Sequence, residues 1–394
     1  MNKAIKITNG KVIMDKVVEK NLYIRNGQIE AITNEELPFD ELIDAKGKYV
    51  SPGFIDTHVH GGGGFDFMDE GEESVVKAAR AHMKHGTTTI LPTTLSESLG
   101  EIMTAVDNIR EAAKEEDVPH IYGAHLEGPW LAMSQKGAMN PEFIIPPRKE
   151  EYERVIEAGK GCVKKVTFAP ELEGAEELCR YLKENNIIPS AGHTEATIED
   201  IKACRKMGLD MVTHLYSSMS TITRRDGYRI PGTVEAAYCF DDMYAEVIAD
   251  GIHLPPDLLK LIYKIKGADR ICLITDAMRG ADMPEGKSYL GSMRHSFECI
   301  IEDGIAKLPD RTCFAGSVAT TDRCVRVFKD LVGVPIEEAV KMMTKTPAIA
   351  HGIKNKGEIK EGYDADLLIF DENIEIEKII LKTNNNIKIY EGEG

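Results

Sequence analysis

Polar side chains able to bind a metal ion or move a proton follow short apolar runs at separated points of this 394-residue chain. The runs cover residues 54–60, 122–126, 189–192, 211–213 and 271–275. Each is typical of a buried strand, where a titratable residue needs a chemical reason. The residues are His58 and His60 in the first run, Glu127, His193, His214 and Asp276 directly after the others, and His253 shortly after the run 246–250.

Glu127, His193 and His214 form the set most typical of a metal site. Neutral imidazoles and a carboxylate suit Zn²⁺, Fe²⁺, Mn²⁺ or Co²⁺, and three protein ligands leave a position open for water. Each residue alone would more often be a core histidine, a salt bridge or a cap, but three at successive strand ends favour a metal. His58 and His60 project to the same side of a strand and could hold a second ion. A hydrogen-bonded histidine pair fits that spacing equally well.

Asp276 follows an apolar strand, where an unpaired carboxylate would be costly to bury. Beside a metal-activated water it could accept a proton and return it to a leaving amine. A helix N-cap or a structural hydrogen bond is the competing interpretation. Together these residues predict metal-dependent hydrolysis of an amide.

Repeated β/α units would bring these residues together. Apolar runs between residues 52 and 347 alternate with amphipathic stretches such as 74–85, 175–184 and 197–207. The last begins with Thr197 and Asp200, which resemble a capping box. About eight units fit this span, which favours a closed (β/α)8 barrel of the TIM type over an open sheet. The carboxyl ends of all strands meet on one face of such a barrel.

Both ends of the chain have the character of β-structure. Strand-like runs cover 3–7, 11–14, 21–24 and 29–32, and later 366–370, 376–381 and 387–390. Asn9-Gly10 and Asn26-Gly27 are predicted to be tight hairpin turns. We therefore expect residues 1–51 and 348–394 to form one small β domain beside a barrel of residues 52–347.

Composition narrows the classes of partner and compartment. The formal net charge of −17 disfavours nucleic acids and anionic membranes, which require basic surface. No run approaches the ~20 apolar residues of a transmembrane span, and the N-terminus has no features of a signal peptide. The eight cysteines include no Cys-x-x-Cys pair, which indicates reduced thiols in a cytoplasmic protein.

Residues 51–61, Ser-Pro-Gly-Phe-Ile-Asp-Thr-His-Val-His-Gly, resemble the opening strand of the amidohydrolase superfamily. Further segments, in family order over nearly the whole chain, resemble the N-acetylglucosamine-6-phosphate deacetylase family. They are His-Leu-Glu-Gly-Pro-Trp at 125–130, Ala-Gly-His-Thr-Glu-Ala-Thr at 191–197, Thr-His-Leu-Tyr at 213–216, Ala-Asp-Gly-Ile-His at 249–253, Thr-Asp-Ala-Met at 275–278, Phe-Ala-Gly-Ser at 314–317 and Gly-x-Ile-x-x-Gly-Tyr-Asp-Ala-Asp-Leu at 357–367.

This resemblance implies a barrel with a β-sandwich built from both termini. It implies a divalent metal on Glu127, His193 and His214, Asp276 as acid and base, and His253 in contact with the substrate. In some members the His-x-His pair, here His58 and His60, binds a second ion. The resemblance also implies a small amino-sugar phosphate as substrate, and a homodimer in which an arginine reaches the substrate across the interface.

Met139 departs from the family pattern. The family usually has a His there, in Lys-Gly-Ala-His-Asn-Pro, which helps to polarise the substrate carbonyl. A thioether has no proton to donate, and losing such a donor typically costs about 2.7–4 kcal/mol of transition-state stabilisation. Our hypothesis is that a second ion at His58 and His60 substitutes for it.

Two further departures lie where the sugar phosphate is recognised. Ser217 and Ser218 replace the usual Asn-Ala that contacts the phosphate. In the loop 224–232, Arg229 fits the family motif Gly-Arg-Glu-Pro-Gly, whereas Arg225 better fits its spacing from His214. Arginines beside a ligand loop favour an anion pocket, and either residue could bind the phosphate.

The predicted function is release of acetate from N-acetylglucosamine-6-phosphate by a metal-activated water, with Asp276 as proton shuttle. Alternatives are the galactosamine epimer, an unphosphorylated sugar, or another amidohydrolase of the hydantoinase or D-aminoacylase type. An inactive metal-binding scaffold is the non-enzyme alternative; Met139 favours it, and Asp276 disfavours it. The expected substrate contacts are His253, Ser217, Ser218, Arg225 or Arg229, Ala138, Met139, Phe314, Ala315 and Gly316.

Overall fold

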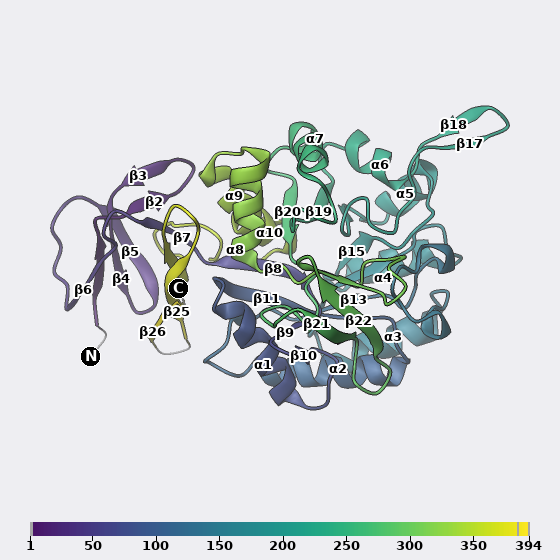
Figure 1. Ribbon diagram of the computed structural model, residues 1–394, viewed down its shortest axis with the longest axis horizontal. Coiled ribbons are helices and arrows are strands. Elements are labelled where there is room, and N and C mark those ends of the chain that lie inside the picture. Colours follow the sequence, from purple (N-terminus) through teal and green to yellow (C-terminus); the bar gives the residue numbers. More distant parts are fainter. Residues whose placement is uncertain (1–2, 384–385, 393–394) are drawn as a thin grey trace.

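Eight parallel strands form a barrel at the centre of the molecule (Figure 1). The computed structural model describes residues 3–383 and 386–392. Neighbouring strands are hydrogen-bonded, and the ring closes where the Asp276 N–H donates to the His58 carbonyl at 2.9 Å and the His60 N–H to the Ala277 carbonyl at 2.7 Å. The strands, in order around the ring, are β8 (Phe54–Val59), β11 (Thr87–Thr94), β13 (Ala124–Glu127), β14 (Val163–Phe168), β15 (Ile188–Ala191), β16 (Met211–Val212), β19 (Tyr244–Ile248) and β20 (Ile271–Ile274). The predicted α/β barrel is confirmed.

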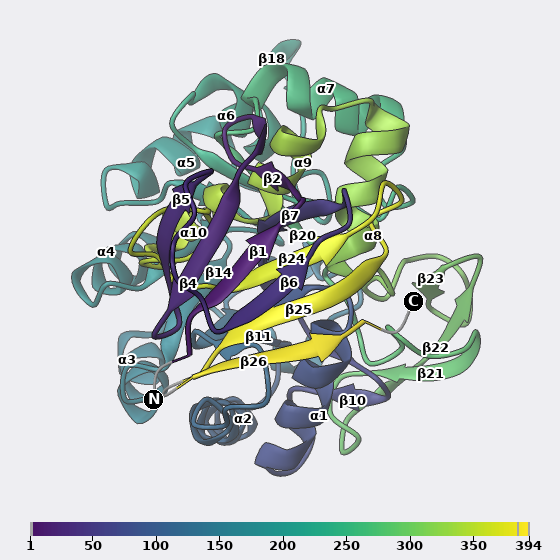
Figure 2. The same ribbon diagram turned by 90° about the vertical axis from the view of Figure 1, so that its left-hand side faces the viewer.

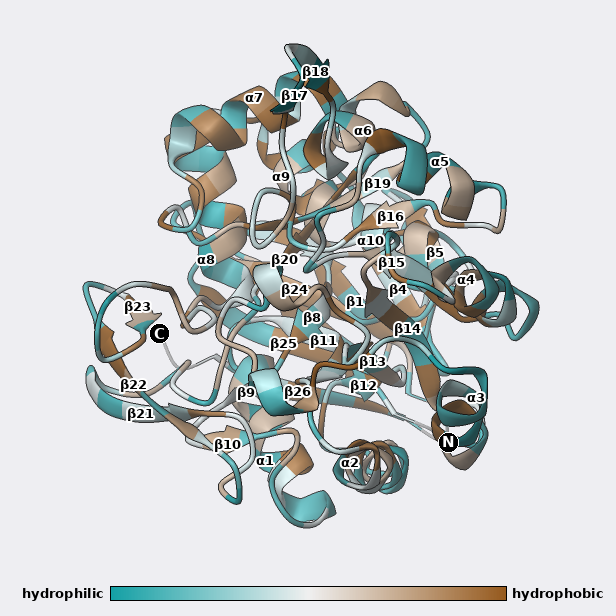
Figure 3. Ribbon diagram, turned by 90° about the vertical axis from the view of Figure 1, so that its right-hand side faces the viewer, coloured by the Kyte–Doolittle hydropathy of each residue, from teal (hydrophilic) through white to brown (hydrophobic). Residues whose placement is uncertain are grey.

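Helices cover the outside of this ring, and Figure 3 shows hydrophilic and hydrophobic stretches alternating along them. In α4 (Ala175–Glu184) the buried residues Ala175, Leu178 and Leu182 recur at helical spacing and form one apolar face. The predicted capping box is present in α5 (Ile198–Arg205), where the Asp200 carboxylate accepts the Thr197 N–H at 2.8 Å. The other helices are α1 (Glu72–Met83), α2 (Leu99–Ala112), α3 (Lys149–Ala158), α6 (Thr233–Cys239), α7 (Pro256–Lys266), α8 (Thr321–Arg326), α9 (Ile336–Met343) and α10 (Lys345–His351).

Two sheets from the chain ends form the β-sandwich. Figure 2 shows the C-terminal strands, in yellow, beside the N-terminal strands, in purple. Apolar residues of both sheets, such as Ile7, Leu22, Val50 and Leu367, form one core between them. The four-stranded sheet contains β5 (Gln28–Thr33), β4 (Asn21–Arg25), β1 (Ile5–Thr8) and β6 (Glu41–Asp44), and the six-stranded sheet contains β26 (Ile387–Glu391), β25 (Ile376–Lys382), β24 (Leu367–Phe370), β7 (Tyr49–Pro52), β2 (Lys11–Ile13) and β3 (Val17–Glu19). We propose that the β domain and the barrel meet at 51/52 and 347/348; the second boundary lies within α10.

One predicted hairpin is confirmed, and the other is wrong. Asn26-Gly27 joins the paired strands β4 and β5, with φ angles of 55° and 74°. Asn9-Gly10 instead links β1 to β2, which lie in different sheets. A Cβ at Gly10 would lie 2.6 Å from Val50 Cγ2, so glycine here permits close packing at a corner between the sheets.

Two hairpin insertions project from the barrel. A sheet of β21 (Gly286–Leu290), β22 (Phe297–Glu302) and β23 (Ile305–Lys307) follows β20 and packs Leu290 and Ile301 against Met278. The hairpin of β17 (Thr223–Arg225) and β18 (Tyr228–Ile230) extends away from the barrel, at the upper right of Figure 1. Among the residues described, no helix combines the length and apolar character that crossing a bilayer requires.

Candidate active site

The predicted metal ligands converge at the carboxyl ends of the barrel strands. Glu127 lies at the end of β13, His193 follows β15, and His214 follows β16. The ligand atoms of these three buried residues lie within 4.8 Å of one another. Glu127 forms a second such group with His58 and His60, so its carboxylate is common to both.

The first group has the donor arrangement that a cation requires. His193 Nδ1 lies 2.7 Å from the Gln135 carbonyl oxygen, to which it donates. The lone pair of Nε2 therefore faces Glu127 Oε1, 3.2 Å away, and His214 Nε2 is 2.8 Å from the same oxygen. His193 Nε2 and Glu127 Oε1 are both acceptors, and their close approach is unfavourable unless a positive charge lies between them. The residues present thus fit a divalent ion.

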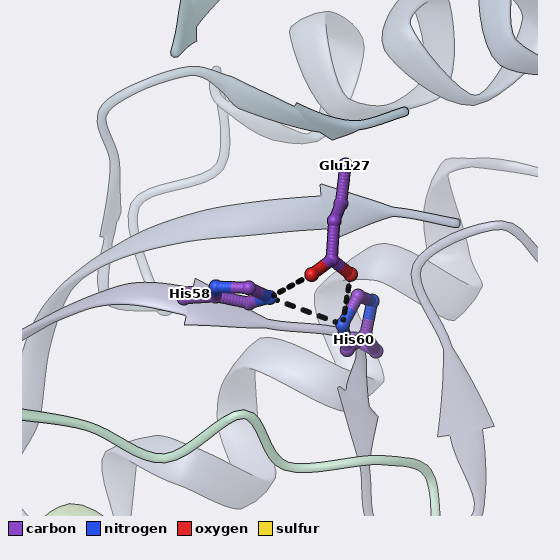
Figure 4. A group of neighbouring side chains, drawn as sticks. All are labelled: His58, His60 and Glu127. Atoms are coloured by element: carbon purple, nitrogen blue, oxygen red, sulfur yellow. Dashed lines mark hydrogen bonds and ion pairs between the residues drawn. The ribbon is translucent and has the colours of Figure 1, made fainter. Parts of the chain in front are cut away.

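Figure 4 shows His58 of β8 and His60, which directly follows that strand, pointing toward the Glu127 carboxylate. His58 Nε2 is 3.4 Å from Oε1, and His60 Nε2 is 3.2 Å from Oε2. The two Nε2 atoms are 3.3 Å apart. His60 Nδ1 lies 3.3 Å from the Thr93 carbonyl oxygen, which can take its proton and leave Nε2 free for the site.

Asp276 faces the same cluster from the end of β20. Its Oδ1 lies 3.1 Å from His60 Nε2 and 3.4 Å from His58 Nε2. Burial alone would raise the pKa of Asp276, but His58 and His60 outweigh burial and hold that pKa below its ordinary value. An ionised carboxylate can accept a proton, as a general base must.

Backbone strain marks the strand ends that carry these groups. His193, His214 and Asp276 have φ angles of 47°, 31° and 49°. Residues other than glycine enter this left-handed region rarely, and each costs on the order of 1–3 kcal/mol. Three such residues follow β15, β16 and β20. The backbone there adopts an unfavourable conformation that directs these side chains toward the site.

The acidic groups dominate the electrostatics of the cluster. Burial opposes a charge on His58, but Glu127 and Asp276 outweigh it and raise the pKa of His58 to about 9. The same carboxylates, against the same opposing effect of burial, raise the pKa of His60 to about 10. Burial also opposes ionisation of Glu127, yet the histidines hold its pKa well below the usual range. The two carboxylates thus favour positive charge at this position, which a divalent ion would also supply.

A cavity opens above the cluster and contains most of the predicted substrate contacts. Its wall includes His60, Glu127, His193, His214 and Asp276. Five lining residues were not predicted from the sequence, because isolated apolar residues, a glycine and a single cysteine carry no chemical signal. The predicted contacts that line it are Ala138, Met139, Ser217, Ser218, His253, Phe314 and Gly316, and the missed residues are Leu95, Gly137, Ile248, Leu290 and Cys313.

The loop after β13 positions Met139 in this wall. The Ser96 N–H points to Met139 Sδ at 3.5 Å, which fixes the thioether beside the end of β11. Gly137 has a φ of 56°, and a Cβ there would lie 2.9 Å from Ser218 Oγ and 3.4 Å from a ring carbon of His193. Glycine thus allows the loop to lie directly on His193 and Ser218.

His253 is oriented by an acidic neighbour. Its Nδ1 lies 2.7 Å from Asp250 Oδ2, and Asp250 Oδ1 accepts the backbone N–H groups of Ile252 and His253 at 2.8 Å each. The Phe314 ring lies edge-on to the imidazole, with centroids 4.8 Å apart. Because His253 Nδ1 donates its proton to Asp250, Nε2 is the ring nitrogen available to a ligand.

Three predicted contacts do not line this cavity. Arg225 and Arg229 are exposed on the β17–β18 hairpin, away from the cluster. Ala315 is fully buried in the apolar cluster that includes Leu290 and Met278. Within one chain, the cavity therefore has no arginine among its described lining residues.

The amidohydrolase family pattern matches residues 49–391. An N-acetylglucosamine-6-phosphate deacetylase of Lysinibacillus sphaericus is 32% identical over 375 residues, which are 93% of this chain and 95% of the relative. This chain belongs to the amidohydrolase family, among the N-acetylglucosamine-6-phosphate deacetylases.

Other members of this family are similar over nearly their whole lengths. An N-acetylgalactosamine-6-phosphate deacetylase of Escherichia coli O157:H7 is 31% identical over 92% of this chain and 93% of its own. An aspartate-to-alanine variant of the Mycobacterium smegmatis N-acetyl-D-glucosamine-6-phosphate deacetylase, solved in complex with N-acetyl-D-glucosamine-6-phosphate, has a TM-score of 0.87 and 28% identity, and the match covers 98% of this chain and 99% of that one. The family resemblance inferred from the motifs is confirmed.

Proposed function

We propose that this protein hydrolyses the N-acetyl group of N-acetylglucosamine-6-phosphate to glucosamine-6-phosphate and acetate. The observation that carries the proposal is the convergence of Glu127, His193 and His214 with Asp276 in the wall of one cavity. Relatives named for this activity cover nearly the whole chain, which favours the phosphorylated sugar as substrate. The hydantoinase and D-aminoacylase alternatives lack comparable support.

A divalent ion on Glu127, His193 and His214 would polarise the acyl carbonyl and lower the pKa of the attacking water. Asp276, whose carboxylate faces this position, accepts the proton of that water as it attacks the carbonyl carbon. Asp276 then donates the proton to the nitrogen as the carbon–nitrogen bond breaks, which lets the amine leave uncharged. His253 and the loop of Phe314 and Gly316 orient the sugar over the cluster.

Met139 leaves the carbonyl without the donor that the family usually supplies, and we assign this role to a second ion on His58 and His60. Zinc is our first choice for both ions; Fe²⁺, Mn²⁺ and Co²⁺ suit the same ligands. Replacing both histidines with Asn should lower kcat for acetate release by about 10²–10³-fold and reduce bound metal from two ions to one. Metal analysis and initial rates test this, with His85→Asn as control. One ion in the active wild type, together with an unchanged rate in the variant, would refute the assignment.

Phosphate recognition falls to Ser217 and Ser218 in the cavity and to an arginine of the β17–β18 hairpin. Since Arg225 and Arg229 lie away from their own cavity, we propose that the hairpin completes the cavity of a second subunit in a homodimer. Arg225→Ala and Arg229→Ala should be made separately. In the one that removes the phosphate ligand, KM for the phosphorylated sugar should rise about 10–100-fold, because a charge-assisted hydrogen bond contributes about 1.5–3 kcal/mol. The unphosphorylated sugar should show no change. Arg224→Ala is the control; equal effects on both sugars would contradict the role.

Release of acetate from four compounds tests the proposed function. They are N-acetylglucosamine-6-phosphate, its galactosamine epimer, and both sugars without phosphate. We expect turnover of the first to exceed that of the others. Preference for the galactosamine epimer would support the same chemistry on a different sugar. If the metal-bound protein hydrolyses none of the four compounds, the inactive metal-binding scaffold is favoured. A cytoplasmic location stays a prediction.

A further inference from the structure

A buried ion pair lies inside the barrel, beneath the cluster of histidines. Lys165 on β14 and Glu246 on β19 have no exposed surface. The Lys165 ammonium donates to Glu246 Oε1 and, at 2.9 Å, to the Thr57 carbonyl oxygen. The Thr57 hydroxyl donates to the same Oε1 at 3.1 Å. Burying two charges is expensive, so a pair at this position calls for a reason other than stability.

The other carboxylate oxygen of Glu246 faces His58. Glu246 Oε2 and His58 Nδ1 are 3.5 Å apart. Each is buried, and within residues 3–383 and 386–392 neither has a hydrogen-bond partner. Two complementary atoms left unsatisfied within reach of each other form a natural donor and acceptor, since buried polar groups rarely stay unpaired.

A second imidazole near this carboxylate, that of His351, has no proton to offer. His351 Nε2 is 4.0 Å from Glu246 Oε1. Its Nδ1 donates to the Pro347 carbonyl at 2.9 Å, and burial lowers the pKa of His351 to about 4. The neutral ring therefore carries its single proton on Nδ1, facing away from Glu246.

We propose that Glu246, held in place by Lys165, is a positioning residue that keeps the proton of His58 on Nδ1. Nε2 then carries the lone pair that faces Glu127 and His60, as a metal ligand must. Carboxylates that accept the second N–H of a ligand histidine commonly set its tautomer and ring orientation. Lys165 neutralises the carboxylate and occupies Oε1, so Oε2 is left for His58. This inference rests on the proposed metal site.

Glu246→Gln reverses the polarity of the contact without changing its shape. The amide oxygen must face the Lys165 ammonium, which turns the NH₂ group toward His58 Nδ1. The histidine proton then moves to Nε2, where it blocks an ion. We expect the Zn²⁺ affinity that depends on His58 to fall by about 10–100-fold. His58→Asn identifies which ion is concerned, and Asp366→Asn, which alters a buried carboxylate paired with Lys356, is the matched control.

A second substitution should reverse this loss. In Lys165→Met with Glu246→Gln, the amide is free to turn its oxygen toward His58 Nδ1, and Zn²⁺ affinity should return to within a few-fold of wild type. Lys165→Met with Glu246→Leu has no acceptor and should remain about 10–100-fold weaker. Both double variants lack buried charge at this position, and such replacements are usually tolerated by the fold. These two double variants therefore test the proposal even if Glu246→Gln alone fails to fold.

The measurement is Zn²⁺ competition against a chromogenic chelator, with the metal-stripped full-length protein and thermal unfolding as a check on folding. The proposal is supported if Zn²⁺ affinity falls in Glu246→Gln and recovers only in the double variant Lys165→Met with Glu246→Gln. Equal affinities in the two double variants, or no effect of His58→Asn, overturn it. No substrate is present, so failure of the wild type to release acetate would count against the proposed function alone.

Discussion

Replacing Asp276 with Asn is expected to lower kcat for N-acetylglucosamine-6-phosphate by about 10²–10⁴-fold, the usual contribution of a general acid and base. The amide side chain cannot accept the proton of the attacking water or return it to the leaving amine. Asparagine tolerates a left-handed φ, such as the 49° of Asp276, so the backbone should be retained. Metal content and the unfolding midpoint should change little.

Asp282→Asn is the matched control for this experiment. Asp282 also has a left-handed φ, of 59°, but it pairs with His85 away from the cluster. Initial rates, metal analysis and thermal unfolding should be measured on both variants. Normal turnover in Asp276→Asn would contradict the proton-shuttle mechanism, whereas loss of metal together with activity would make Asp276 a ligand.

Replacing Glu127 with Gln is expected to remove the principal ion and to lower acetate release by about 10³-fold or more. Glu127 is the one carboxylate common to both groups of ligand atoms, so its charge serves both. Without the ion, water keeps a pKa near ~15.7 in place of ~7, and attack on the carbonyl becomes very slow. Metal analysis and initial rates test the prediction.

Glu97→Gln is the control for Glu127, because Glu97 is also buried but pairs with His295 outside the cluster. It should keep its metal and most of its activity. A Glu127→Gln variant that retains both metal and wild-type rate would contradict the assignment of Glu127 as a ligand.

The barrel and its cluster could be predicted because their signal is local in sequence. Apolar runs such as 271–275 each end in a polar residue, and the parallel arrangement brings those ends to one face. His193 and His214, 21 positions apart in the chain, have Nε2 atoms 3.2 Å apart in the structure. That the carboxyl ends of parallel barrel strands meet on one face can be applied without knowing any individual contact.

Features that depend on tertiary packing could not be predicted. Asn9-Gly10 and Asn26-Gly27 have similar local preferences, and only the pairing of the flanking strands separates a corner from a hairpin. Leu95 and Leu290 line the cavity because the insertion after β20 packs against Leu95, which follows β11. The residue type of an apolar side chain does not predict that it will line a cavity. The direction of the β17–β18 hairpin likewise depends on contacts that no turn motif encodes.

The residue types of Lys165 and Glu246 indicate in part what the structure shows. Each is a charged residue in a barrel strand whose other buried side chains are mostly apolar, and an unpaired charge there would be very unfavourable. That they pair with each other follows only from the barrel, which brings β14 and β19 to face one another across its interior. Their relation to His58 Nδ1 is geometric and required the structure.

Acetate release from N-acetylglucosamine-6-phosphate, before and after chelation and after return of Zn²⁺, tests the central claim most directly. The account predicts turnover by the purified protein, its loss on removal of the metal, and its recovery when the ion is restored. Turnover that persists in fully metal-free protein would contradict a metal-dependent mechanism at Glu127, His193 and His214.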